Sequence, residues 1–362
     1  MDKFCKYCGA MLNSEAKCEN CNYQANTAET ENATYTPEEI LNRATKKINE
    51  LAGETGAVKL NIADLFSEVF HKHTTNEAEE IFISGTSRTT PPEKDISSTW
   101  PKPWLFSRVF IMFLATFALL FLCYDTLGNS NALPGMIFVG AIAVPISLVI
   151  FFMEVNAPRN ISFFEVMKVF FVGGGASLVI TLVLFSFAAN IDGYTGAVIT
   201  GIIEEAGKLI IIAYFLNKYK NIRFILSGIL IGATVGAGFA AFETSGYILN
   251  YGLTYGKDVM MDVLILRAFL TPGGHVIWGA ILGAALMLAK GTNPFSTAHL
   301  TDKKFISFFV MCVAMHSIWD MPIYIKYYLV QIAMTVIAWI IALVLIDVGL
   351  KEISKLIDSD EN

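Results

Sequence analysis

Eight long apolar segments fill residues 104–348 and constrain the fold more than any other feature of the chain. They run about 105–124, 134–153, 164–188, 196–216, 225–250, 269–289, 305–325 and 327–347, each close to the ~20 residues that a helix needs to cross a bilayer. Only 25 of the 245 residues in this block are charged. This is a much smaller share than the ~25% of charged residues in soluble domains. The sequence therefore predicts an all-α polytopic membrane protein with about eight transmembrane helices. The apolar composition, with 54% hydrophobic residues, excludes a soluble enzyme and a disordered chain, and the net charge of -6 excludes a nucleic-acid binder driven by positive charge.

Four cysteines near the start of the chain have the spacing C-x2-C-x9-C-x2-C: Cys5, Cys8, Cys18 and Cys21. Two residues between paired thiolates let both reach one ion, and four thiolates form a closed structural zinc site. The alternative is two disulfides in an exported segment, but no signal peptide precedes the cysteines. We therefore expect a small zinc ribbon with four cysteine ligands and Zn²⁺ as its structural ion, and its binding partner is unknown.

The composition divides the chain into four parts. Residues 1–24 form the expected ribbon, 25–103 a polar and partly helical cytoplasmic linker region, 104–350 the multi-pass domain and 351–362 a cytoplasmic tail. Thr36-Pro37 predicts a helix start, and residues 254–268 are expected to lie along the membrane interface. Twelve basic residues fall in one set of loops and three in the other, so the positive-inside rule puts both termini in the cytoplasm.

Ionisable residues inside the apolar segments are the candidate functional residues, because each costs on the order of 2.5–3.5 kcal/mol at mid-helix. They lie at a similar depth in four segments, in the expected outer half of the bilayer. The main set is Glu204, Glu205, Glu243, His275 and His316, and the supporting residues are Lys208, Tyr247 and Asp320. Glycine stripes at 228, 232 and 236 and at 279 and 283 predict close helix packing between two of these segments.

Each of these residues also has a purely structural interpretation. Lys208 could neutralise one glutamate as a buried ion pair, and His316 could pair locally with Asp320. His275 could cap a helix broken at Pro272-Gly273-Gly274. The common depth of all of them favours a shared pocket over four separate structural roles.

Four motifs in this order resemble the PrsW family of intramembrane proteases, distant relatives of the CAAX prenyl proteases. They are Glu204-Glu205-x-x-Lys208, Phe242-Glu243-x-x-x-Tyr247, Arg267-x7-His275 and His316-x-x-Trp319-Asp320. The resemblance covers residues 104–350 and implies a multi-pass endopeptidase. Family members cut a membrane-anchored anti-sigma factor near the outer face, so it implies a membrane-anchored protein as substrate. The ribbon is additional to these motifs.

Two chemistries fit the candidate residues. In one, His275, His316 and Glu243 hold a divalent metal, expected to be Zn²⁺, and Glu204 or Glu205 takes a proton from its bound water. In the other, Glu204 and a histidine activate water without metal, and His316 with Asp320 stabilises the oxyanion. Two rival classes stay open: a proton- or ion-coupled secondary transporter with a ribbon module, and a non-catalytic membrane sensor.

Overall fold

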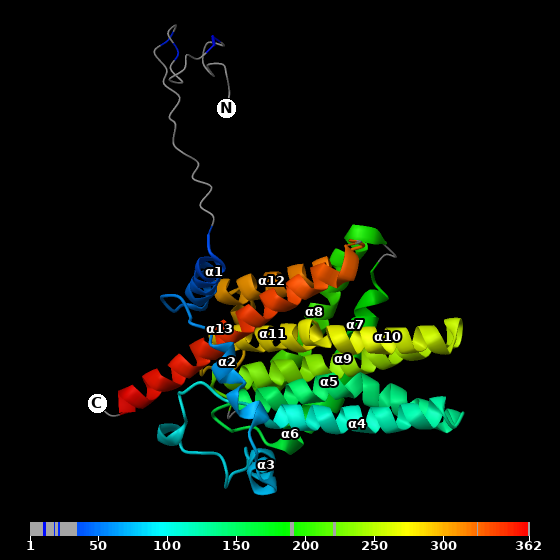
Figure 1. Ribbon diagram of the computed structural model, residues 1–362. Coiled ribbons are helices and arrows are strands. Elements are labelled where there is room, and N and C mark those ends of the chain that lie inside the picture. The colour runs from blue at the N-terminus through cyan, green and yellow to red at the C-terminus, as the bar shows by residue number, and fades with distance from the viewer. Residues whose placement is uncertain are drawn as a thin grey trace. The chain divides into compact units, whose positions relative to one another are not determined.

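The computed structural model describes residues 10–11, 18, 21, 35–188, 192–219, 222–323 and 325–360 (Figure 1). The chain separates into two units, Met1–Arg43 and Ala44–Asn362. Most of the expected ribbon, including Cys5 and Cys8, lies outside the described residues, which include only Cys18 and Cys21 of its four cysteines. The zinc ribbon therefore stays a prediction.

The first described helix, α1 (Pro37–Ala52), begins where the sequence predicts it. The Thr36 hydroxyl accepts from the Glu39 backbone N–H at 3.2 Å, and the Thr36 backbone N–H donates to the Glu39 carboxylate at 2.9 Å. This reciprocal capping satisfies two backbone N–H groups that a helix start otherwise leaves unpaired.

Short helices follow α1 and pack on the membrane helices: α2 (Ile62–Leu65), η1 (Ser67–Phe70), α3 (Thr75–Phe82) and η2 (Glu93–Asp95). The Phe66 ring lies 6.0 Å from that of Phe106, and the Phe82 ring lies 5.0 Å from that of Phe163. Leu65 is buried in the same apolar core as the membrane helices. The part of the expected linker region that follows residue 43 is thus a packed layer of the larger unit.

The rest of that unit is helical. Its elements are α4 (Leu105–Asp125), η3 (Ser130–Ala132), α5 (Leu133–Val155), α6 (Phe163–Lys168), the π-helical turn η4 (Val169–Gly173), α7 (Gly174–Phe185), α8 (Gly193–Lys218), α9 (Ile225–Tyr255), α10 (Lys257–Leu270), η5 (Thr271–Gly273), α11 (His275–Lys290), η6 (Thr297–Thr301), α12 (Lys303–Asp320), η7 (Lys326–Tyr328) and α13 (Leu329–Asp360).

Six helical segments among the described residues are long and apolar enough to cross a membrane. They are Leu105–Asp125, Ser130–Val155, Phe163–Phe185, Ile225–Tyr255, Lys257–Lys290 and Leu329–Asp358. The two other expected spans form α8 and α12. Helix α8 carries Glu204, Glu205 and Lys208, and α12 begins with two lysines and ends at Asp320, so neither is as apolar as the six. The count of eight spans stays a prediction.

Helices α9 and α11 form the most closely packed pair and lie side by side in Figure 1. A Cβ atom on Gly232 would collide with the carbonyl oxygen of Gly279, and one on Gly283 would collide with that of Gly228. Both glycine stripes therefore face each other, as the sequence predicts. Backbones in direct contact place the side chains at the ends of the two stripes close together.

Residues 254–268, which the sequence predicts along the membrane interface, form the end of α9 and most of α10, and α10 belongs to the segment Lys257–Lys290 that is long and apolar enough to cross a membrane. After Gly256, which has a left-handed φ of 89°, α10 turns back along α9 and continues in line with α11 (Figure 1). Both of its basic residues are paired: Lys257 Nζ lies 2.9 Å from Asp125 Oδ1, and Arg267 binds Glu243. Pairing lowers the cost of placing such charges beside apolar helices.

Candidate active site

Helix α8 presents its two adjacent glutamates in different directions, because successive helical residues are about 100° apart. Glu204 lines a cavity of about 500 Å³. Glu205 is fully buried, and its Oε1 accepts from Lys208 Nζ at 2.6 Å, one turn along the same helix. The chain therefore separates the two carboxylates: Glu204 faces the cavity, and Glu205 faces protein.

Helix α12 places His316 between these carboxylates. Its Nδ1 lies 2.7 Å from Glu205 Oε1, and its Nε2 lies 3.6 Å from Glu204 Oε2 and 3.3 Å from Asp320 Oδ2. The imidazole stacks on the Trp278 ring at 4.5 Å between ring centres. Because an ionised carboxylate can only accept, Nδ1 carries a proton toward Glu205, and Nε2 faces two further carboxylates, those of Glu204 and Asp320.

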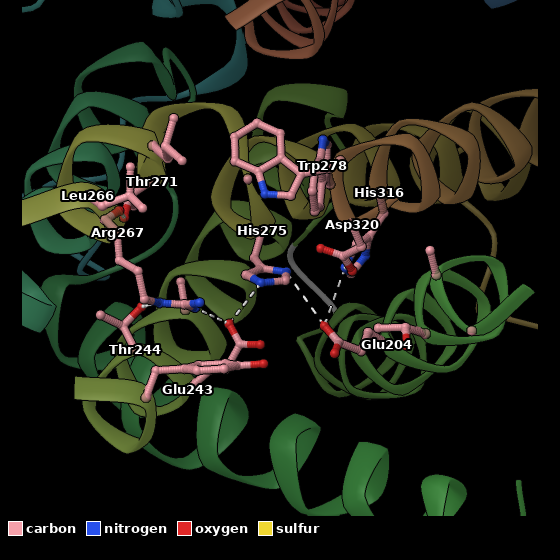
Figure 2. A pocket seen from close by; sticks show the side chains of 18 of the residues that line it. Glu204, Glu243, Thr244, Leu266, Arg267, Thr271, His275, Trp278, His316 and Asp320 are labelled. Carbon is pink, nitrogen blue, oxygen red and sulfur yellow. Dashed lines mark hydrogen bonds and ion pairs between the residues drawn. The ribbon is translucent and has the colours of Figure 1, made fainter. Parts of the chain in front are cut away.

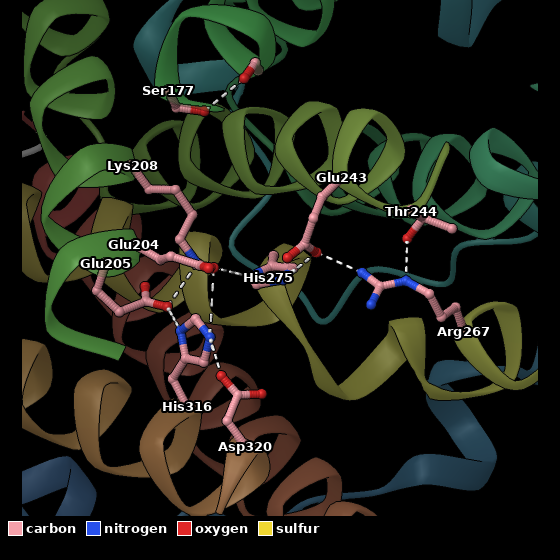
Figure 3. Close-up of polar contacts among 11 residues, drawn as sticks. Ser177, Glu204, Glu205, Lys208, Glu243, Thr244, Arg267, His275, His316 and Asp320 are labelled. Atoms are coloured by element: carbon pink, nitrogen blue, oxygen red, sulfur yellow. Dashed lines mark hydrogen bonds and ion pairs between the residues drawn. The ribbon is translucent and has the colours of Figure 1, made fainter. Parts of the chain in front are cut away.

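His275 is the first residue of α11 and reaches the same centre from the opposite side (Figure 3). Its Nε2 lies 3.0 Å from Glu243 Oε2, while its Nδ1 lies 3.0 Å from Lys208 Nζ and 3.9 Å from Glu204 Oε2. An ammonium has no acceptor, so Nδ1 carries the lone pair and Nε2 the proton. Each imidazole thus donates to one carboxylate and turns its other nitrogen toward Glu204.

The break between α10 and α11 sets the position of His275, and α13 holds that break. Trp339 Nε1 donates to the Pro272 carbonyl at 3.0 Å. A Cβ on Gly273 would collide with the Thr335 side chain of α13. Glycine is required at this position because the backbone of the break lies directly against another helix.

Arg267 anchors Glu243 on the far side of His275. Its Nη2 lies 2.5 Å from Glu243 Oε2, and its Nε donates to Thr244 Oγ1 at 2.9 Å. The guanidinium also lies 4.3 Å from the centre of the Tyr247 ring. Sequence reasoning placed Arg267 in a motif but gave it no role. A role for Arg267 could have been inferred from the sequence, because a cation close to an apolar segment that carries a histidine is itself a candidate functional residue.

Side chains from α8 to α12 line the cavity (Figure 2). Besides the groups above, Thr200 and Asp192 of the α8 end and Trp319 of α12 border it. Of the expected residues, Glu204, Glu243, His275, His316, Tyr247 and Asp320 all line this one cavity. Glu205 and Lys208 do not, and they support it from within the protein.

Glu204, His275 and His316 form the one group of at least three ligand residues that could hold a metal within the described part of the chain. One ligand atom from each lies within 4.8 Å of the other two. The third candidate donor of this group is Glu204, whereas the sequence suggested Glu243, which in the structure contacts Arg267 and the Nε2 atom of His275.

The residues present fit a divalent ion. Two histidines and one glutamate are a known catalytic zinc set, and Glu204 Oε2 is a buried oxygen without a hydrogen-bond partner in the described structure. The protonated nitrogens bind Glu243 and Glu205, an arrangement that fixes imidazole ligands in metal sites. A metal ion and Lys208 would compete for the single lone pair of His275 Nδ1.

The fold and site together define a multi-pass helical membrane protein with a buried histidine–glutamate centre open to a cavity. The model of the PrsW family of intramembrane metalloproteases matches residues 163–346. The chain belongs to this family, as its four motifs indicated, and the family is one of metal-dependent peptidases.

Relatives named Protease PrsW share modest identity with the chain. The protein of Shouchella clausii is 28% identical over 133 residues, which are 35% of this chain and 57% of that protein. The protein of Halalkalibacterium halodurans is 24% identical over 212 residues, which are 56% of this chain and 92% of that protein. The protein of Clostridioides difficile is 25% identical over 172 residues, which are 45% of this chain and 68% of that protein. No solved structure matches the chain.

Proposed function

We propose that this protein is an intramembrane endopeptidase that hydrolyses a peptide bond of a membrane-anchored protein, similar to an anti-sigma factor, near the outer face of the cell membrane. The observation that carries the proposal is the position of Glu204. Its Oε2 faces one imidazole nitrogen of His316 at 3.6 Å and one of His275 at 3.9 Å, at the wall of a cavity. Peptide hydrolysis needs an activated water, a polarised carbonyl and a proton donor at the leaving amine.

Two versions of this chemistry use the same side chains. With a divalent ion, His275 Nδ1, His316 Nε2 and Glu204 would hold it, and the ion would polarise the carbonyl and acidify a water molecule. Without an ion, Glu204 is the general base, and His316 with Asp320 faces the developing charge. In both versions Glu205 and Glu243 orient the imidazoles and do not touch the substrate.

The cavity suits an unwound peptide segment. Its lining includes Asp192 and Gly193, where α8 begins, and Asp320, where α12 ends. We place these helix ends at the outer membrane face, with both termini in the cytoplasm, from the distribution of basic residues in the loops. The amino-terminal cysteines are proposed to bind a structural Zn²⁺ in the cytoplasm.

The proposal is tested with purified full-length protein and a single-pass substrate in detergent. Glu204→Gln keeps the size of the side chain but removes its charge, and it should slow cleavage by on the order of 10²–10⁴-fold without loss of folded protein. Glu165→Gln is the matched control, because Glu165 pairs with Lys168 at 2.6 Å and does not line the cavity. Cleavage by Glu204→Gln at the wild-type rate would exclude the proposed centre.

A further inference from the structure

The guanidinium of Arg267, beside the cavity, is held by three side chains of one neighbouring helix. Three side chains of α9 contact it: Glu243 at 2.5 Å, Thr244 at 2.9 Å and the ring of Tyr247 at 4.3 Å from its centre. These residues occupy positions i, i+1 and i+4 of one helix. The guanidinium is therefore fixed in both position and orientation, because a planar fork bound at two nitrogens cannot rotate.

Glu243 transmits this orientation to His275. The same oxygen, Oε2, accepts from Arg267 Nη2 and lies 3.0 Å from His275 Nε2. The Glu243 side chain is only 15% exposed and that of His275 13%, so their contact is largely shielded from bulk water. A carboxylate fixed by arginine requires the proton of the imidazole on Nε2, and this leaves the lone pair of Nδ1 facing Lys208 Nζ at 3.0 Å and Glu204 Oε2 at 3.9 Å.

We propose that Arg267 is a positioning residue of the active site, which acts through Glu243 to hold the His275 ring with Nε2 toward Glu243 and Nδ1 toward Glu204. This inference rests on the proposed function, and it adds α10 to the elements that build the centre. Without Arg267, Glu243 keeps one partner and can rotate away from Nε2. His275 then loses its partner at Nε2 and keeps the contact of Nδ1 with Lys208, while Glu204 and His316 stay in place.

The chain contains a matched control on the same helix. Lys257 of α10 also binds a carboxylate, Asp125 at 2.9 Å, and also lies over a tyrosine ring, Tyr124 at 4.8 Å. It is remote from the cavity lining. Lys257→Met therefore removes a cation, an ion pair and a cation–π contact from α10. It leaves the contacts that link Arg267 to His275 through Glu243 unchanged.

The test compares Arg267→Met, Arg267→Lys and Lys257→Met in the full-length protein by Co²⁺ titration and by cleavage kinetics. Cobalt bound by the cysteines absorbs through sulfur-to-metal charge transfer, so its signal is separate from that of a nitrogen- and oxygen-bound ion. Arg267→Met should weaken Co²⁺ binding at the site with nitrogen and oxygen ligands by about 10–100-fold. It should also lower kcat with little change in KM. Arg267→Lys should fall between the wild type and Arg267→Met, and Lys257→Met should match the wild type.

A double variant separates positioning through Glu243 from a general loss of stability. If Arg267 acts through Glu243, Glu243→Ala with Arg267→Met should bind Co²⁺ no more weakly than Glu243→Ala alone, because the two changes break one chain of contacts. The inference is overturned if the losses of Co²⁺ affinity in the two single variants multiply in the double variant. It is also overturned if Arg267→Met keeps the Co²⁺ affinity of the wild type. If Arg267→Met does not fold, Arg267→Lys carries the same comparison. A wild type that binds Co²⁺ but cleaves nothing would refute the proposed function and leave this inference standing.

Discussion

Lys208 and Glu205 are the two fully buried charges of the candidate site. Lys208 donates to Glu205 and His275, and lies 5.4 Å from the centre of the Trp278 ring. A buried ion pair adds little net stability, but removing one partner leaves the other charge unpaired and costs about 3–5 kcal/mol. Lys208 thus neutralises Glu205 and frees Glu204 to be the carboxylate at the cavity.

Lys208→Met should therefore destabilise the protein by about 3–5 kcal/mol, because Glu205 would keep a buried charge opposed only by His316. Unfolding in a denaturing detergent mixture, followed by tryptophan fluorescence, measures this change. Lys218→Met is the control, since Lys218 is a more exposed lysine at the end of the same helix. Equal stability of the two variants would show that Glu205 does not need Lys208.

At this scale the sequence predicts which residues converge but not how each is used. Their depth in the membrane follows from counting along each helix, and all of them meet at one cavity or directly behind it. Counting does not give the rotation of one helix relative to another. The choice between Glu204 and Glu243 as third metal donor depends on Arg267, which reaches Glu243 from a different helix.

The contact between α9 and α11 is the element-scale feature on which the site depends. Gly236 lies against the carbonyl of His275 itself, so the glycine stripe sets the distance between Glu243 and His275. A side chain in this interface would force the two backbones apart, because neither can yield as a flexible side chain can.

Gly232→Ala should destabilise the protein by about 1–3 kcal/mol and reduce cleavage by moving His275 relative to Glu204. Gly246→Ala is a control on the same helix, since a Cβ there meets no neighbouring atom. Thermal unfolding and cleavage rates of both variants check this. If Gly232→Ala is as stable and active as Gly246→Ala, the two backbones are not in the contact described.

A second element-scale prediction concerns the capping box of α3. The Thr74 backbone N–H donates to Glu77 at 2.5 Å and lowers the pKa of the Glu77 carboxyl below its usual 4.5. A lowered pKa stabilises the folded form above the ordinary pKa, and this stabilisation is lost as the pH falls through the lower, folded-state pKa. Protection of the Thr74 amide from hydrogen exchange should therefore decrease on acidification below about pH 4.5, where carboxylates begin to protonate. Glu77→Gln should abolish that pH dependence, and an unchanged dependence would contradict the cap.

Helix positions in the membrane unit could be predicted from apolar runs, but α10 could not. Its Lys257, Asp258, Asp262 and Arg267 resemble an interfacial helix in the sequence. The partners that neutralise Lys257 and Arg267 are Asp125 and Glu243, which lie far away along the chain. Hydropathy alone cannot show such pairing, and the same holds for residues 44–103, whose few apolar side chains pack on the membrane helices.

At the scale of the whole molecule, the chain combines a membrane peptidase fold of the PrsW family with an amino-terminal cysteine motif. Residues 44–103 contact the membrane helices of the larger unit, for example where Lys304 Nζ donates to the Ala52 carbonyl at 3.1 Å. Lys304 is at the start of α12, the helix that carries His316. A continuous series of helical contacts therefore runs from the end of α1 to the candidate centre.

The transporter interpretation differs from the peptidase interpretation in what the buried groups must do. A proton-coupled transporter needs its ionisable residues to be reached in turn from both sides of the membrane. In this protein Glu205 and Lys208 are fully buried, and the cavity at Glu204 is also lined by Asp192, where α8 begins, and by Asp320, where α12 ends. Charges held in a fixed buried pair suit a catalytic centre better than groups that must be reached in turn from both sides.

The most direct test of the central claim is cleavage of a single-pass membrane protein by the purified chain in liposomes, with fragments identified by mass spectrometry. Two fragments cut near one membrane face are expected with the wild type, and no fragments with Glu204→Gln or His316→Ala. Intact substrate with the wild type, together with uptake of protons that Glu204→Gln abolishes, would contradict the peptidase function and favour a transporter.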